Sequence, residues 1–310
     1  MPALIAKSKS IEEHADAIAK ILPKVRILIQ LPEGLRWKSN DIVSALEKKG
    51  VEVVVSGGRC FGACDLPLKE AAACKAEAIL HVGHRPFYVK AESPVPVFYY
   101  DWPMDFDIDD KTVMKEAKKL KEDKIGIVTS VQYIEAAKQI TKIMSKSGKN
   151  AEFGGYVLGC WSEAAENLRK KGYETIMFVG SGLFHPLGFD CKYVLDVEEG
   201  KIRDISQEQL KWQKTKYARI SKAREAKNFG ILISSKSGQK ELLARAEKIK
   251  ARLEQRNKKA FIIVMDEIRA ETLSEMRVDA FINTACPRIA DDEWKKPLVN
   301  ADEMDLLLEE

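Results

Sequence analysis

The chain has 310 residues, and its 51 lysines and arginines nearly balance 47 aspartates and glutamates, for a formal net charge of +4. This length allows two or three domains with substantial cores, while the dispersed charge gives no sign of direct nucleic-acid binding. The apolar runs fall far short of the ~20 residues of a membrane span, and the N-terminus lacks the long apolar segment of a signal peptide. We therefore expect a cytoplasmic protein with no membrane partner.

The N-terminal segment is predicted to fold rather than to form a tail. Ser10-Ile-Glu-Glu13 has the capping-box pattern, and apolar residues at helical spacing follow it. A β-branched strand begins at Lys24, in KVRILIQLPEGL, and runs into a loop and a helix, which is how a βαβ unit opens. Further strands are expected in VEVVVSGG at 51–58 and EAILHVG at 77–83.

The same opening occurs twice more, in KIGIVTSVQY from Lys124 and in NFGILISSKSGQ from Asn228. The three openings are spaced by roughly the length of a small domain. The second and third strands of these later units are predicted at 151–159, 174–180, 259–266 and 279–285.

Polar junctions separate the three units. We expect an α/β protein of three similar small domains, each a mainly parallel sheet flanked by helices, which arose by triplication of one unit. The expected domains are residues 1–106, 107–206 and 207–310.

Six cysteines in a reducing compartment are expected to be core residues, metal ligands or catalytic groups rather than disulfides. The stretch RCFGACDLP carries Cys60 and Cys64, and a C-x3-C-x2-C cluster motif would be complete if Pro67 were a cysteine. Any further thiolate ligands of a cluster must therefore come from other parts of the chain.

Three thiols fall just past predicted strands, where ligands of parallel sheets bind. Cys64 and Cys160 follow the second strands of their units, and Cys286 follows the third strand of the last unit. Three thiolates would leave one iron of a 4Fe-4S cluster open for a substrate or cofactor, since an all-cysteine cluster takes four. Coincidence is the alternative at this point. Zinc is a weaker one, because structural zinc sites usually rest on local cysteine pairs.

The remaining cysteines are interpreted differently. Cys74, in an alanine-rich helix, and Cys191, at the start of CKYVLDV, are expected to be small apolar core residues. For Cys60 two interpretations stay open, namely a core residue and a substitute ligand.

Six motifs from all three units point to one family. They are LPEGL at 31–35, FGACD at 61–65, HVGH at 81–84, VLGC at 157–160, FVGSGLFHPLG at 178–188 and TACPRIA at 284–290. Together they resemble the diphthamide-synthesis radical enzymes. The resemblance implies a homodimer of three-domain subunits, each with a 4Fe-4S cluster held by one cysteine from each domain. Matched by motif, these ligands are Cys64, Cys160 and Cys286, and Cys60 has no ligand role.

The resemblance also implies a reaction. S-adenosylmethionine, as cosubstrate, would bind beside the open iron, and an electron from an external donor would pass through the cluster and cleave the bond between sulfur and the methionine γ-carbon. Methylthioadenosine would be released, and the 3-amino-3-carboxypropyl radical would add to C2 of a histidine on translation elongation factor 2. No catalytic side chain is assigned.

Candidate contacts to S-adenosylmethionine are small or polar residues in loops after strands. Gly182 would admit close backbone approach, Gln239 would hydrogen-bond to polar atoms, and Arg288 would pair with the methionine carboxylate. Ordinary turn chemistry is the alternative for each. The full candidate set is Ser130, Gln132, Ser181, Gly182, Ser235, Gln239 and Arg288.

Two rival hypotheses fit the same predicted domain organisation. Quinolinate synthase also looks like three similar α/β domains that share a three-cysteine 4Fe-4S cluster, but it uses the open iron as a Lewis acid without S-adenosylmethionine. The other rival is a non-catalytic partner or electron-relay subunit. The motifs favour the radical enzyme, and the presence of all three thiols argues against a purely structural chain.

Overall fold

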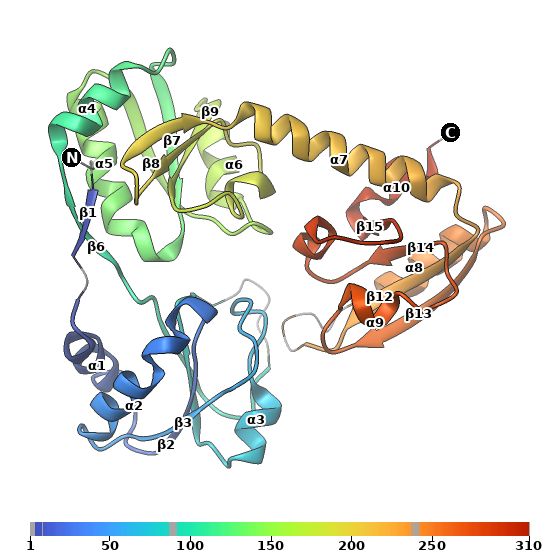
Figure 1. The fold of residues 1–310 in the computed structure, drawn as a ribbon, viewed down its shortest axis with the longest axis horizontal. Helices are drawn as coiled ribbons and strands as arrows, with labels where there is room; N and C mark the ends of the chain where they lie inside the picture. Colours follow the sequence, from blue (N-terminus) through green and yellow to red (C-terminus); the bar gives the residue numbers. More distant parts are fainter. Residues whose placement is uncertain (1–3, 8, 87–91, 237, 239–241, 310) are drawn as a thin grey trace. The chain divides into compact units, whose positions relative to one another are not determined.

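The computed structural model describes residues 4–7, 9–86, 92–236, 238 and 242–309. The chain divides into two compact units, Met1–Ser206 and Gln207–Glu310. The first unit carries two large sheets and a two-stranded one, and the second unit carries one large sheet (Figure 1).

The first large sheet is fully parallel, in the order β3-β2-β4-β5. Alternate residues of β2 face opposite cores: Ile27 and Ile29 pack with α1 and α2, whereas Leu28 packs with α3. Burial on both faces is typical of a parallel sheet between helical layers. The elements are α1 (Ile11–Ala19), β2 (Arg26–Gln30), η1 (Glu33–Lys38), α2 (Ser39–Glu47), β3 (Glu52–Val55), α3 (Leu68–Ala73), β4 (Ala78–Val82) and β5 (Val97–Tyr100).

The second large sheet has the order β11-β10-β9-β7-β8, with β11 antiparallel and the other strands parallel. Helices α4 and α5 share one core with Ile125 and Ile127, and α6 lies over the other face, against Val128. The elements are α4 (Asp110–Lys118), β7 (Lys124–Thr129), η2 (Val131–Tyr133), α5 (Ile134–Lys146), β8 (Asn150–Tyr156), α6 (Glu163–Lys170), β9 (Thr175–Gly180), η3 (Pro186–Gly188), β10 (Tyr193–Asp196) and β11 (Lys201–Asp204).

The second unit holds a parallel sheet in the order β13-β12-β14-β15. Ile231 packs with α7, α8 and α10 on one face, and Leu232 packs with α9 on the other. The elements are α7 (Ser206–Arg224), β12 (Asn228–Ser234), α8 (Leu242–Glu254), β13 (Lys259–Met265), α9 (Ala270–Leu273), β14 (Ala280–Asn283), η5 (Pro287–Asp291), β15 (Leu298–Asn300), η6 (Ala301–Glu303) and α10 (Met304–Leu308).

The three large sheets repeat one arrangement: the first strand lies between the second and the third, and the fourth lies outside the third. The predicted fold class is therefore confirmed, and so is the capping box, since Ser10 and Glu13 exchange hydrogen bonds. Among the described helices, none combines the length and apolar character that a membrane crossing requires.

The exact domain boundaries stay a proposal. Each large sheet falls inside one of the proposed ranges 1–106, 107–206 and 207–310. The small sheet was not predicted: β1 (Leu4–Lys7) pairs antiparallel with β6 (Asp105–Ile108), which straddles the first boundary. The N-terminus is thereby joined to the junction between the first two ranges.

Candidate metal centres at the sheet edges

The three predicted thiols lie on loops that leave the carboxyl ends of parallel strands. Cys64 lies between β3 and α3, Cys160 between β8 and α6, and Cys286 directly before η5. Each residue is partly buried, and none of the chain's six cysteines forms a disulfide. Each of the three proposed domains therefore has one of the predicted thiols on a loop beyond a strand.

The Cys160 loop is held by close backbone approach. A Cβ on Gly188 would lie 2.0 Å from the carbonyl oxygen of Gly159, so only glycine fits there. The amide of Gly159 donates to His185 Nδ1 at 3.1 Å, and the amide of Leu158 donates to the carbonyl of Trp161 at 2.8 Å. The motifs VLGC and FHPLG thus contact each other and fix the backbone on both sides of Cys160.

The Cys286 loop is held by an amide side chain. Asn283 Nδ2 donates to the Cys286 carbonyl at 2.9 Å and to Asn300 Oδ1 at 2.8 Å. Burial raises the pKa of the Cys286 thiol, and the backbone amides of Arg288 and Ile289 oppose that shift by donating toward sulfur. Amides aimed at a sulfur stabilise the thiolate, which is the form that binds metals.

The loop that carries Cys60 and Cys64 is held by Gln30, the buried last residue of β2. Gln30 Nε2 donates to the Asp65 carbonyl at 2.8 Å and, more weakly, to the Arg59 carbonyl at 3.4 Å. These bonds span the loop on both sides of the two cysteines. The loop is therefore fixed by a side chain rather than by contact between backbones.

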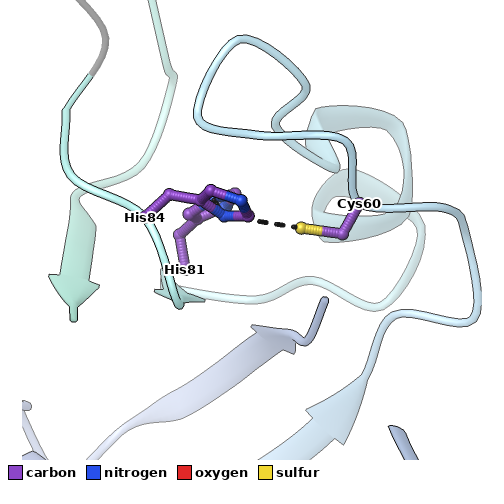
Figure 2. A group of neighbouring side chains, drawn as sticks. All are labelled: Cys60, His81 and His84. Atoms are coloured by element: carbon purple, nitrogen blue, oxygen red, sulfur yellow. Dashed lines mark hydrogen bonds between the residues drawn. The ribbon is translucent and has the colours of Figure 1, made fainter. Parts of the chain in front are cut away.

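Cys60 faces two histidines, His81 in β4 and His84 just beyond the end of that strand (Figure 2). Its Sγ lies 4.0 Å from His84 Nδ1, which lies 3.0 Å from His81 Nε2. The three ligand atoms fall within 4.8 Å of one another, among the residues that the structure describes. Burial lowers the pKa of His81 to about 3 and that of His84 to about 4, so both rings are neutral near pH 7.

Sequence reasoning missed this cluster. The motif HVGH entered only as part of a family resemblance, although its paired histidines around a glycine were a signal of their own. Cys60 is buried, with its sulfur toward imidazole nitrogens, and its role as a core residue or a substitute ligand stays a prediction.

Four of the candidate cosubstrate residues gather at the ends of neighbouring strands β7 and β9. Ser130 follows β7, and Ser181 and Gly182 follow β9; Ser181 Oγ lies 3.4 Å from the Tyr133 hydroxyl. A Cβ on Gly182 would meet nothing within 4 Å, and its φ of +70° favours glycine. Gln132 instead donates from Nε2 to the Gly83 carbonyl at 2.6 Å, which joins the segments that follow β7 and β4.

The remaining candidates belong to the second unit. Ser235 Oγ donates to Asp266 Oδ1 at 2.9 Å, and Arg288 Nη1 pairs with Asp291 Oδ2 at 2.8 Å. Gln239 lies outside the described residues. All seven assignments to S-adenosylmethionine therefore stay predictions.

The other two cysteines occupy apolar surroundings. Cys191 is buried with its Sγ 3.2 Å from the Tyr193 carbonyl, and burial raises its pKa to about 12. Cys74 caps the end of α3, where it is partly buried and packs against the cluster of Leu28 and Ile79. The predicted packing role is confirmed for Cys191, and Cys74 packs at the margin of a core.

Comparisons with known proteins agree over the length of the chain. The family model described as putative diphthamide synthesis protein matches residues 31–310. The 2-(3-amino-3-carboxypropyl)histidine synthase of Pyrococcus horikoshii is 32% identical over 98% of this chain and 90% of that protein. The corresponding synthase of Methanocaldococcus jannaschii is 28% identical over 91% of this chain and 84% of that protein.

Solved structures agree with the sequences. The crystal structure of Dph2 from Pyrococcus horikoshii has a TM-score of 0.82 at 30% identity, covering 98% of this chain and 91% of that one. A structure of Dph2 from the same organism with a 4Fe-4S cluster has a TM-score of 0.81 over the same shares. The chain belongs to the diphthamide synthesis family.

Proposed function

We propose that this protein is a 2-(3-amino-3-carboxypropyl)histidine synthase, the enzyme of the first step of diphthamide synthesis. It transfers the 3-amino-3-carboxypropyl group of S-adenosylmethionine to C2 of a histidine on translation elongation factor 2 and releases methylthioadenosine. The observation that carries the proposal is the match to the Pyrococcus horikoshii synthase, 32% identical over 98% of this chain.

The proposed cofactor is a 4Fe-4S cluster, for which this chain has suitable donors. Cys64, Cys160 and Cys286 are outside disulfides, partly buried and placed on loops beyond parallel strands, and cysteine thiolates are the usual ligands of such clusters. We propose that these three residues hold it. When bound, the cluster supplies the electron that cleaves the sulfur–carbon bond of S-adenosylmethionine.

The protein's own residues then have the task of binding and orienting the cosubstrate. Ser130, Ser181 and Gly182 lie beyond the first and third strands of their sheet, where the strand order reverses and ligands of such sheets bind. Arg288 is proposed to bind the methionine carboxylate. It would have to exchange its ion pair with Asp291 for that contact.

Three further features are proposed from the family. Elongation factor 2 is the protein substrate, an external donor supplies the electron, and the chain acts as a homodimer in the cytoplasm. The archaeal relatives are named as whole synthases, whereas the fungal relative from Schizosaccharomyces pombe is named subunit 1. This difference supports an enzyme built from one kind of chain.

The test is product analysis. The protein is reconstituted anaerobically with iron and sulfide, reduced with dithionite, and mixed with archaeal elongation factor 2 and S-adenosylmethionine labelled at its carboxyl carbon. We expect methylthioadenosine and label on one histidine of the factor. A main product of 5′-deoxyadenosine, or condensation of iminoaspartate with a triose phosphate, would contradict the proposal.

A further inference from the structure

Cys60, His81 and His84 are not used by the proposed iron–sulfur chemistry, yet they have the character of a metal site. Cys60 is 8% exposed and His81 is fully buried. A thiol and two imidazoles bring one sulfur and two nitrogens together, a donor set that suits a borderline-soft divalent cation such as Zn²⁺. Figure 2 shows all three side chains pointing toward a common space.

Gln30 fixes which nitrogen of His81 faces this space. Its amide nitrogen donates to backbone carbonyls, so its Oε1 accepts, and His81 Nδ1 donates to it at 2.7 Å. The proton of neutral His81 therefore sits on Nδ1, and the lone pair of Nε2 points toward His84 and Cys60. A metal-binding histidine is typically oriented in this way, by a hydrogen bond from its other nitrogen.

The turn at Gly83 brings the second imidazole back to the first. Gly83 has a φ of +83°, and a Cβ there would lie 3.0 Å from Pro32 Cγ, so the turn requires glycine. The turn is also held by Gly83's amide, which donates to the Tyr100 carbonyl at 2.7 Å. His84 Nδ1 consequently lies 3.0 Å from His81 Nε2 and 4.0 Å from Cys60 Sγ.

The separations fit a small tetrahedral ion. With zinc–nitrogen bonds of about 2.0 Å and zinc–sulfur bonds of about 2.3 Å, tetrahedral ligands lie about 3.3 Å apart for two nitrogens and about 3.5 Å for sulfur and nitrogen. The corresponding distances are 3.0 Å between the histidines and 4.0 Å between Cys60 and His84. All three donor atoms lie within 4.8 Å of one another, so side-chain rotations would bring them to the spacing that a zinc ion requires.

We propose that Cys60, His81 and His84 bind one Zn²⁺ ion, separate from the iron–sulfur cluster, with the fourth position open to water. Because Cys60 and Cys64 share one loop, the ion would tie this loop to the segment that leaves β4 and so stabilise the backbone that presents Cys64. This site does not depend on the proposed reaction, and its metal is distinguishable from cluster iron.

The experiment uses the enzyme with its cluster already in place, so that the cluster cysteines are not available to zinc. Holoprotein is incubated with equimolar zinc, passed through a desalting column, and analysed for zinc and iron by mass spectrometry and by X-ray absorption at the zinc edge. We expect one zinc per chain, with one sulfur at about 2.3 Å and two imidazole nitrogens at about 2.0 Å.

Four variants assign the ligands. Cys60→Ala and His84→Ala should each lose most of the zinc and keep the iron, and retained iron shows that the variant is folded. Cys74→Ala, which removes a thiol outside the cluster, should keep both metals. Cys64→Ala, in which the remaining cluster cysteines become available to zinc, should lose iron and still bind at least one zinc per chain.

Three outcomes would overturn the proposal. One is wild-type holoprotein without zinc above the level of a buffer control. A second is full zinc in both Cys60→Ala and His84→Ala, which would place the ion elsewhere. The third is loss of iron in Cys60→Ala, which would make Cys60 a cluster ligand. The product analysis of the proposed function is unaffected by the first two.

Discussion

Two loops of the first unit have the same place in the fold and are held in different ways. The β3–α3 loop with Cys64 and the β8–α6 loop with Cys160 each follow the second strand of a mainly parallel sheet. The first is fixed by a side-chain network around Gln30, and the second by contact between Gly159 and Gly188. A repeated topology therefore determines where a thiol lies, while the local sequence determines what keeps it there.

The largest effect is expected from variants that test whether these two loops and the Cys286 loop bind one cofactor together. Replacing Cys64, Cys160 or Cys286 singly by alanine should reduce the iron–sulfur absorbance and iron content to a small fraction of wild type, because each removes a proposed ligand. Cys191→Ala should keep both, since Cys191 is a buried apolar residue. Full iron content in any of the three variants would show that the replaced cysteine is not a cluster ligand, so that the loops do not play equivalent roles.

The next effect tests the backbone contact of the Cys160 loop. In Gly188→Ala the new methyl group would collide with the Gly159 carbonyl, so the two segments must separate. We expect a loss of about 1–3 kcal/mol in the free energy of unfolding, as for other overpacked sites, together with loss of most cluster iron. Urea unfolding and iron analysis measure the two effects.

Gly148→Ala is the matched control for that substitution. Gly148 has a φ of +94°, but a Cβ there meets nothing within 4 Å. The left-handed backbone should cost about 1–2 kcal/mol without affecting iron. If both variants retained full iron, the contact between VLGC and FHPLG would be irrelevant to Cys160.

The third prediction compares the buried polar residues that end β2 and β7. Gln30→Leu should lower the free energy of unfolding by about 1–3 kcal/mol, because the Asp65 carbonyl and His81 Nδ1 lose their partner in the interior. It should also weaken zinc binding by roughly 10–100-fold, as expected for a residue that orients a metal ligand. Chelator competition gives the second value.

Thr129→Val is the corresponding change in the second sheet. Thr129 makes one side-chain hydrogen bond, to the Val179 carbonyl at 2.6 Å, so the expected loss is about 1 kcal/mol with no change in zinc affinity. Equal zinc affinities of wild type and Gln30→Leu would mean that the Gln30 network supports the fold alone.

The sequence predicts most of the fold because its signals are local. The first strand of each α/β domain is a β-branched run buried on both faces, such as Ile27, Leu28 and Ile29. The pattern of strand, loop and helix recurs at a domain-sized interval. The short fourth strand Leu298–Asn300 carries little signal of its own, and β1 is recognisable only through its pairing with β6. Pairing between distant segments is not encoded in local periodicity.

The same difference between local signals and long-range contacts applies to the candidate sites. The placement of Cys64, Cys160 and Cys286 on loops could be predicted because each thiol follows a recognisable strand. The motif HVGH could indicate the paired histidines but not their approach to Cys60, because that approach depends on the left-handed turn at Gly83 and on a loop that Gln30 holds from another strand. Cysteine spacing made zinc the weaker hypothesis for the site of Cys64, Cys160 and Cys286, and the zinc ion proposed at Cys60 concerns a different group of residues.

The smallest expected effect concerns pH. It tests whether a histidine in the helical layer of the first sheet, like the histidines in and beside the sheet itself, resists protonation. His14 on α1 stacks on Trp102 at 3.8 Å between ring centroids, and its Nδ1 lies 2.9 Å from the Tyr100 hydroxyl. Burial lowers the pKa of His14 to about 4. The charged groups that also act on it are Lys9 and Lys38, which lower the pKa, and Glu13 and Asp105, which raise it.

The sign of the effect follows from this lowered pKa. The unfolded chain binds a proton near pH 6.5, whereas the folded chain resists it until about pH 4, so stability from neutral His14 is present above pH 6.5 and is lost as the pH falls toward 4. Amide hydrogen exchange in α1 should accelerate between pH 6.5 and 4.5, after correction for intrinsic rates, while exchange in α5 changes less. His14→Phe should remove most of this difference. Equal acceleration in α1 and α5, or no effect of the substitution, would assign the acid sensitivity to groups outside this helical layer.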